Sequence, residues 1–130
     1  MAGVSSVLGR DYPPVQFSIE AEHVAAFARA LGCAPEAGVP PTYAAVYALA
    51  TTVPQLFADE EAGVDVARLV HGEQEFEWER HPRAGEKIQA QGRVIEDVTR
   101  RNLRFLTLET TCSGEDGRPF CRSRMMSVIR

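Results

Sequence analysis

The stretch from Val39 to Phe57, VPPTYAAVYALATTVPQLF, carries no charged residue in a chain where 25% of the residues are charged. Pro40 and Pro41 suit the first turn of a helix, where a missing backbone N–H costs little. Tyr43 to Val53 favours a helix without a polar stripe, and Pro54 is expected to end its regular hydrogen bonding. A helix that is apolar on all sides belongs inside a folded domain. Its prolines, threonines and many alanines argue against the alternative, a membrane span.

Length and composition predict a single domain spanning 1–130 with an ordinary core, since 45% of the residues are hydrophobic. The net charge of -4 argues against nucleic acid as a partner. Cys33, Cys112 and Cys121 have no CxxC spacing and cannot pair evenly, which favours free thiols in a reducing compartment. The N-terminal residues MAGVSSVLGR lack the apolar run of a signal peptide, so we expect a cytoplasmic protein that does not enter a membrane.

The first third of the chain predicts a short strand followed by a helix. Residues 1–14 form a turn-like lead-in, and Val15 to Ile19 alternates as a strand does. A helix is expected from Ser18 or Glu20 to Leu31, and Gly32 is expected to stop it.

The second half has period-2 alternation, which is typical of strands. Leu69 to Arg80 is the clearest case: one predicted face holds Val70, Gly72, Gln74, Phe76 and Trp78, and the other holds His71, Glu73, Glu75, Glu77 and Glu79. Further strands are predicted at Lys87 to Val98, Leu103 to Cys112 and Phe120 to Ile129. Arg100 to Asn102 and Gly114 to Gly117 supply turns. We therefore predict an α+β fold, an antiparallel sheet of about five strands against the apolar helix.

Several stretches resemble the N-terminal MaoC-like dehydratase family, which includes non-catalytic halves of actinobacterial (3R)-hydroxyacyl dehydratases. Leu69 to Phe76 (LVHGEQEF) and Arg80 to Lys87 (RHPRAGEK) are similar to its strand-and-turn signature. Val39 to Tyr43 (VPPTY) resembles the start of its central helix, and Gly9 to Pro14 (GRDYPP) resembles its N-terminal lead-in. The resemblance implies a hot-dog fold, in which the sheet wraps around one long central helix.

The chain departs from the catalytic relatives in the loop from Gly32 to Gly38, which is shorter than theirs. Those relatives place an Asp there and a His about five residues later, whereas this chain has Cys33 and no His between Leu31 and His71. Dehydration of a 3-hydroxyacyl thioester needs a base for the C2 proton, an acid for the leaving hydroxyl and donors for the thioester oxygen. We therefore predict no catalytic residue in this chain.

The resemblance thus implies the non-catalytic, acyl-chain-binding half of an (R)-specific enoyl hydratase or 3-hydroxyacyl dehydratase. The implied partners are an acyl-CoA or acyl-carrier-protein thioester and a second hot-dog subunit, in a homodimer or in a heterodimer with a catalytic subunit. No cofactor is implied. Two alternatives stay open: a self-sufficient hot-dog hydratase or thioesterase, using Glu36 or a residue of the central helix as its acid, and a non-enzymatic acyl-binding or scaffold protein.

The candidate substrate-binding residues lie on the apolar helix and on the Leu69 to Arg80 strand. Tyr43 and Tyr47, one helical turn apart, would rim a substrate tunnel or pack in the core or at a dimer interface. His71 would line an acyl or pantetheine channel or play a structural role. The full candidate set is Tyr43, Ala45, Tyr47, Leu49, His71 and Trp78.

Two charged groups are less specific. The glutamates of the Leu69 to Arg80 strand indicate a solvated face paired with arginines on adjacent strands, and we predict no metal site there. Basic residues near the turns would meet a phosphate of CoA or phosphopantetheine or form ordinary surface charge: Arg80, Arg83, Lys87, Arg100 and Arg101.

Overall fold

The computed structural model describes residues 6–130, so the first five residues of the expected lead-in lie outside the described residues. Five strands form one antiparallel sheet in the order β1-β3-β4-β5-β2. Their bounds are β1 Val15–Ser18, β2 Leu69–Trp78, β3 Lys87–Arg100, β4 Leu103–Ser113 and β5 Pro119–Ile129. The predicted strands are confirmed to within two residues at each end.

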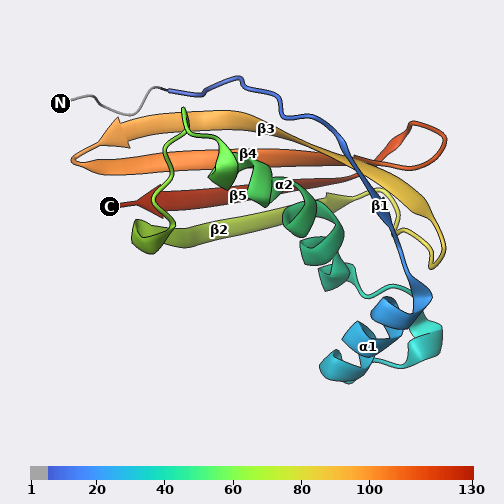
Figure 1. Cartoon of the computed structure of the whole chain (residues 1–130). Coiled ribbons are helices and arrows are strands. Elements are labelled where there is room, and N and C mark those ends of the chain that lie inside the picture. The colour runs from blue at the N-terminus through green and yellow to red at the C-terminus, as the bar shows by residue number, and fades with distance from the viewer. Residues whose placement is uncertain (1–5) are drawn as a thin grey trace.

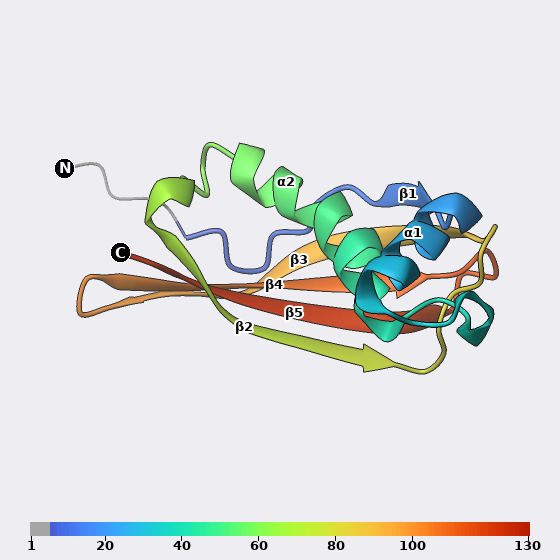
Figure 2. The same ribbon diagram turned by 90° about the horizontal axis from the view of Figure 1, so that it is seen from below.

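The helices lie on one side of the sheet (Figures 1 and 2). α1 (Ala21–Leu31) ends at Gly32, whose left-handed φ of 76° forms the cap expected there. α2 (Ala50–Ala58) packs across the sheet, while α1 lies beyond the edge of the sheet. The predicted α+β arrangement is confirmed. Within residues 6–130 no helix is long and apolar enough to span a bilayer.

The apolar segment is not one regular helix. It passes from a 3₁₀ turn at Pro41–Tyr43 through a π-helical turn at Ala45–Leu49 into α2. Pro54 lies inside α2, so the prediction that regular hydrogen bonding ends there is wrong. Proline clashes with the carbonyl four residues earlier, and a wider preceding turn relieves such a clash.

Threonine hydroxyls satisfy carbonyls next to this irregular turn. The Thr51 hydroxyl donates to the Tyr47 carbonyl at 2.8 Å, and the Thr52 hydroxyl donates to the Ala48 carbonyl at 2.8 Å. These side-chain bonds supply partners that a regular helix would draw from its own backbone.

Burial of the apolar segment is one-sided, contrary to the expectation from its composition. Tyr43, Ala44, Tyr47 and Ala48 are buried against the sheet, whereas Ala45 is exposed and Leu49 is half-buried. A helix packed on one sheet loses only one of its sides to that sheet. The other side keeps apolar surface without cover in this chain.

Gly92 on β3 lets α2 approach the sheet closely. A Cβ built at this position would lie 3.2 Å from Leu108 Cδ1 and 3.3 Å from Thr52 Cβ. Next to this contact, the buried hydroxyls of Thr52 and Thr110 share a hydrogen bond of 2.8 Å. The helix is therefore held to the sheet by a close backbone approach and a satisfied polar pair.

A β-bulge in β2 corrects the predicted faces of this strand. Its register against β5 shifts between His71 and Glu73. Strict alternation therefore fails at Gly72, and the residues before it lie on the opposite face from the one that alternation predicts. His71 pairs with Ser127, an inward-facing residue, and Val70 pairs with Val128 on the outer face. The prediction that His71 and Trp78 lie on different faces of the strand is therefore wrong, because both lie on the inward face.

The N-terminal lead-in is tied to the end of α2. Asp59 Oδ2 accepts hydrogen bonds from the Tyr12 hydroxyl and from Arg10, both at 2.7 Å. The Tyr12 bond, together with Arg10, holds the pKa of the Asp59 carboxyl below its ordinary value. The Gly9 to Pro14 motif thus has a structural role, which is to anchor the helix over the sheet.

Candidate functional site

An aromatic cluster connects the apolar helical segment to the end of β2. The Trp78 indole N–H donates to the Tyr47 hydroxyl at 3.1 Å. Trp78 stacks on Phe76, with ring centroids 5.5 Å apart and an angle of 25° between the planes. Burial above all raises the pKa of Tyr47 well beyond its ordinary value, so its phenol stays neutral and keeps a proton to donate.

Tyr43 extends the cluster toward α1. Its ring centroid lies 6.2 Å from that of Tyr47, and its hydroxyl shares a hydrogen bond of 2.8 Å with His23 Nδ1. Burial also raises the pKa of Tyr43. His23 stands among charged residues in the sequence, a setting typical of a solvated side chain. The ring is exposed but has a buried partner, and no sequence signal linked two residues on separate helical segments.

His71 lies apart from this cluster, at the other end of the inward face of β2. Seven residues separate it from Trp78, which corresponds to about 23 Å along a strand. Its Nε2 donates to Gln74 Oε1 at 3.1 Å, and Gln74 Nε2 donates to the Ser123 hydroxyl at 2.9 Å. Gln74 and Ser123 were missed as polar site residues, because strict alternation placed His71 on the opposite face.

The structure thus unites only part of the candidate set. Tyr43, Tyr47 and Trp78 form one contact network, while His71 belongs to a separate polar group. Tyr43 and Tyr47 are 0% and 1% exposed, so neither presents a free surface in this chain. Ala45, Leu49, His71 and Trp78 keep exposed surface.

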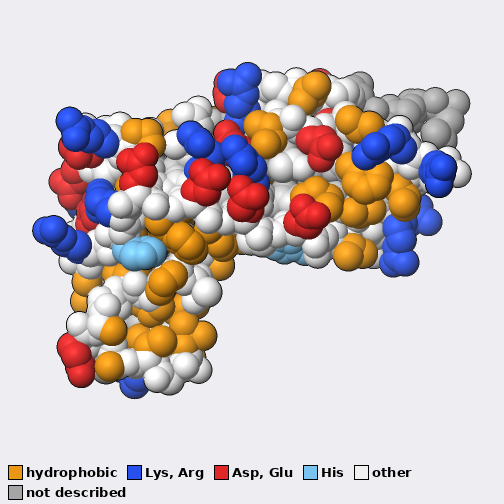
Figure 3. Space-filling view, turned by 180° about the vertical axis from the view of Figure 1, so that it is seen from behind, with side chains coloured by type: hydrophobic (Ala, Val, Ile, Leu, Met, Phe, Trp, Pro, Cys, Tyr) orange, Lys and Arg blue, Asp and Glu red, His pale blue; other side chains and the backbone are white. Residues whose placement is uncertain are grey.

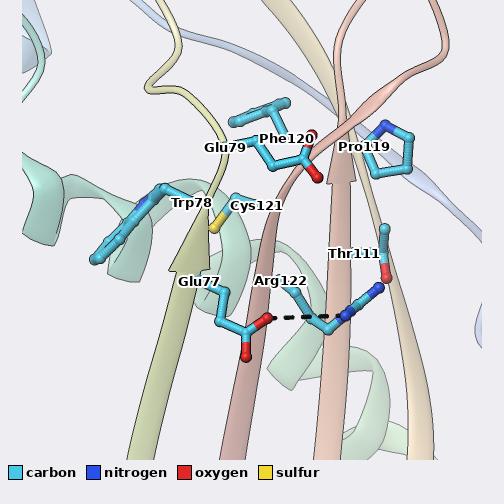
Figure 4. A pocket seen from close by; sticks show the side chains of 8 residues that line it. All are labelled: Glu77, Trp78, Glu79, Thr111, Pro119, Phe120, Cys121 and Arg122. Atoms are coloured by element: carbon cyan, nitrogen blue, oxygen red, sulfur yellow. Dashed lines mark ion pairs between the residues drawn. The ribbon is translucent and has the colours of Figure 1, made fainter.

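A shallow pocket of about 160 Å³ lies where β2 and β5 end their pairing, and Figure 4 shows the side chains that line it. Trp78 extends from it toward the helices, and the Cys121 sulfur lies between the two strands. Cys121 faces Cys112 directly across the β4–β5 ladder, and both are free thiols. The hydrogen bond with Cys121 and burial raise the pKa of the Cys112 thiol, which makes it a poor nucleophile.

A second, mainly apolar groove of about 310 Å³ lies under α1. It runs between α1 and the turn before β3, with Val24, Ala28, Val39 and Pro82 in its wall and Arg83 among its lining residues. Its volume reaches the lower end of the range of small-molecule sites.

The loop from Gly32 to Gly38 supplies no acid–base pair. Cys33 and Glu36 are exposed, with no hydrogen bond from either side chain among residues 6–130. Over the same residues no imidazole is hydrogen-bonded or ion-paired to a carboxylate, and no group of three potential metal ligands converges. The arrangement offers apolar surface at Ala45, Leu49 and Trp78, held in place by the buried and hydrogen-bonded phenols behind it, and such a surface can bind and orient an apolar ligand.

The basic residues near the turns do not converge on one site. Arg80 is paired with Glu86 through two hydrogen bonds of 2.7 and 3.0 Å, and its guanidinium lies over the Phe120 ring. Arg100 lies over the Phe105 ring, at the other end of the sheet from Arg80. Arg83 is the one member of the group that lines the groove under α1.

Comparison with known proteins gives relatives in several actinobacteria. The chain is 29% identical to a UPF0336 protein of Saccharopolyspora erythraea, over 96% of this chain and 90% of the relative. It is 35% identical to a UPF0336 protein of Streptomyces avermitilis, over 68% of this chain and 69% of the relative.

Solved structures share the fold at low sequence identity. A chain of the HadBC (3R-hydroxyacyl-ACP dehydratase) complex from Mycobacterium tuberculosis superposes with a TM-score of 0.76 at 21% identity, covering 96% of this chain and 98% of that one. The (R)-hydratase from A. caviae involved in PHA biosynthesis gives 0.64 at 17%, covering 98% and 100%. The ChsH1-ChsH2 complex from Mycobacterium tuberculosis gives 0.69 at 12%, covering 92% and 83%.

These structures confirm the hot-dog fold and the MaoC-like resemblance that the sequence motifs predicted. Residues 6–123 match the family described as FAS1-like, dehydratase domain region. The match takes in α1, the apolar helical segment and the β2 signature, the same elements that build the aromatic cluster. The chain therefore belongs to the FAS1-like dehydratase domain region family.

Proposed function

We propose that this chain is the non-catalytic, acyl-chain-binding half of an (R)-specific enoyl hydratase or 3-hydroxyacyl thioester dehydratase. It acts as one domain over residues 1–130, and its substrate is an acyl-CoA or acyl-carrier-protein thioester. Three free thiols support a reducing compartment, the cytoplasm.

The observation that carries the proposal is a dehydratase-family fold without an acid–base pair. Between α1 and the apolar helical segment, the short loop offers only the exposed Cys33 and Glu36, and no imidazole in residues 6–130 is hydrogen-bonded or ion-paired to a carboxylate. Elimination of water needs both proton transfers within hydrogen-bond reach of the substrate. A second subunit that brings these groups would complete the site.

The acyl chain is proposed to bind where apolar surface remains uncovered at the helix and at the open edge of β2. Ala45 and Leu49 offer exposed or half-exposed apolar surface, and Trp78 and His71 mark the two ends of the inward face of β2. Tyr43 and Tyr47 lie behind them as positioning residues, because both are buried and hydrogen-bonded.

The partner is proposed to pair along β2, the longer of the two edge strands of the sheet. A ten-residue edge strand has unpaired backbone groups that a second strand satisfies. A homodimer and a heterodimer with a catalytic hot-dog subunit both provide such a strand.

The test is recovery of the partner from the native host with the tagged chain, followed by hydration assays on enoyl thioesters. We expect activity only when chain and partner are mixed, and no turnover by either alone. Hydration by the purified chain alone, or hydrolysis of acyl-CoA by it, would instead favour the self-sufficient hydratase or thioesterase. Tight acyl-thioester binding with no turnover in any mixture would favour an acyl-binding scaffold.

A further inference from the structure

The outer face of the β2 edge is acidic along its whole length beyond the bulge. Glu73, Glu75 and Glu77 lie opposite Met126, Arg124 and Arg122 of β5, on the face away from the helices. Glu79, one residue beyond the end of β2, continues the run of alternate glutamates in the sequence, and its backbone N–H still bonds to the Phe120 carbonyl at 2.8 Å. Figure 3 shows this outer face, where Asp and Glu side chains gather beside Lys and Arg side chains.

The arginines of β5 only partly neutralise this acidic row. Arg124 is 3.1 Å from Glu75, and Arg122 is 3.9 Å from Glu77. Both guanidiniums are also shared with Glu109 of β4, at 2.9 and 3.9 Å.

Two guanidiniums thus face the carboxylates of Glu109 and of the whole row. Glu73 and Glu79, at the two ends of the row, make no ion pair within residues 6–130. The side chains of Glu75 and Glu77 remain 58% and 59% exposed. The edge therefore presents uncompensated negative charge to whatever strand adds to it.

Two-fold symmetry would bring the acidic rows of two copies of the chain together. Two copies joined along β2 about a two-fold axis pair antiparallel, and the register must keep outer face with outer face. Every such register over residues 73–79 places glutamate opposite or diagonal to glutamate. Like charges directly opposite each other on paired strands are destabilising.

We infer that the acidic row on β2 selects against a second copy of this chain and fits a partner strand with Lys or Arg at alternate outward-facing positions. This inference rests on the proposed function in one respect, which is the pairing of a second subunit along β2. It goes further by favouring a heterodimer over a homodimer. The row acts as a repulsive element that excludes the wrong partner, and its attraction for cations favours the right one.

The experiment uses the full chain and two variants, measured by sedimentation velocity at low salt and at about 0.5 M salt, where exposed charges are screened. One variant carries Gln and the other carries Lys in place of Glu73, Glu75, Glu77 and Glu79. A control variant carries Gln in place of four exposed glutamates away from β2, so its net charge changes by the same amount as that of the Gln variant. These glutamates are Glu20, Glu22, Glu36 and Glu60. Circular dichroism melting confirms that each variant is folded.

We expect the wild-type chain to stay monomeric at low salt, and the Gln variant to self-associate at least about tenfold more tightly, or about 1.4 kcal/mol. The mixture of wild type and Lys variant is expected to dimerise at least about tenfold more tightly than either alone. Hydrogen exchange over residues 69–78 should slow in that mixture, and high salt should remove the gain. The control should behave as the wild type does.

Three results would overturn the inference: a wild-type homodimer at low salt that protects β2, a Gln variant no tighter than the control, or a mixture no tighter than its components. If the Lys variant does not fold, the self-association of the Gln variant compared with that of the control still tests the inference. A catalytic partner that binds wild type and Gln variant equally would refute the charge selection and leave the proposed function intact. If wild type and Lys variant form the mixed dimer but no hydratase partner is recovered from the host, the proposed function is refuted and the charge selection stands.

Discussion

Removing one partner of the ion pair between Asp97 and Arg104 should cost this fold a large share of its stability. Arg104 Nε donates to Asp97 Oδ1 at 2.8 Å, and a second guanidinium nitrogen donates to Oδ2 at 2.9 Å. Oδ2 also accepts from the Val7 backbone N–H at 2.8 Å, and Arg104 donates to the Ala62 carbonyl. The pair thus ties the N-terminal segment and the loop after α2 to the β3–β4 hairpin.

Asp97→Asn keeps the shape of the side chain and removes its charge. The side chains of Arg104 and Asp97 are only 10% and 4% exposed, so the substitution leaves a nearly buried guanidinium without a counter-ion. Breaking a buried pair on one side costs about 3–5 kcal/mol. For a chain of this length we expect the melting temperature to fall by about 10–20 °C.

The loss should depend on pH in a defined direction. Burial disfavours the charged form of Asp97, but the hydrogen bonds from Arg104 and Val7 outweigh it, and the net pKa lies below its ordinary value. A carboxyl with a lowered folded pKa stabilises the fold above its unfolded pKa of about 3.9 and loses that contribution as pH falls through the folded pKa. The difference between wild type and Asp97→Asn is therefore largest near pH 7 and shrinks below about pH 4.

Urea unfolding at pH 7 and at about pH 3 measures both effects, with Asp11→Asn as the matched control. Asp11 and Arg93 form an exposed pair at 3.9 Å, for which we expect a loss below about 1 kcal/mol. A loss for Asp97→Asn no greater than that of the control, or one that persists undiminished at pH 3, would refute the reasoning.

Four further substitutions test the site and its support. Gly92→Ala should destabilise the fold by about 1–3 kcal/mol, because its Cβ would press on the helix and on β4; urea unfolding with an unchanged midpoint would contradict the close approach. Cys33→Asp should create no hydratase activity in the isolated chain, since no imidazole accompanies it; turnover above the wild-type background in a steady-state assay would count against the missing-dyad argument. Leu49→Trp, and Ala45→Trp at the exposed position, should slow long acyl substrates in the reconstituted complex more than short ones. Equal losses on both lengths, in folded variants that still pair, would disprove the acyl-binding assignment.

The strands and their faces were largely predictable from the sequence. Period-2 alternation places Ile88 and Val94 inward and Arg122 and Arg124 outward, as the structure has them. Alternation works because successive strand residues point to opposite faces, and burial of one face separates apolar from polar residues. The family motifs were also readable, and the absence of an Asp/His pair from the loop before the apolar segment is a property of the sequence itself.

Local backbone irregularities were not predictable, and two of them changed the site. The sequence contained Pro54 but did not show how the chain would accommodate it, which is by a π-helical turn before α2 and not by ending the helix. The bulge at Gly72 moved His71 to the inward face beside Gln74. One extra residue in a strand reverses every side chain on one side of it, and the composition of the strand does not record the reversal.

Contacts between distant segments were decided only by the tertiary structure. The sequence provided the apolar helical segment and the strands but could not pair Tyr43 with His23, or Tyr47 with Trp78. It also contained the alternate glutamates from Glu73 to Glu79 without showing that β2 is an edge strand of the sheet. Strand order follows from how the whole chain buries its apolar faces at once, so the exposed edge, and the charge it presents to a partner, exist only in the folded domain.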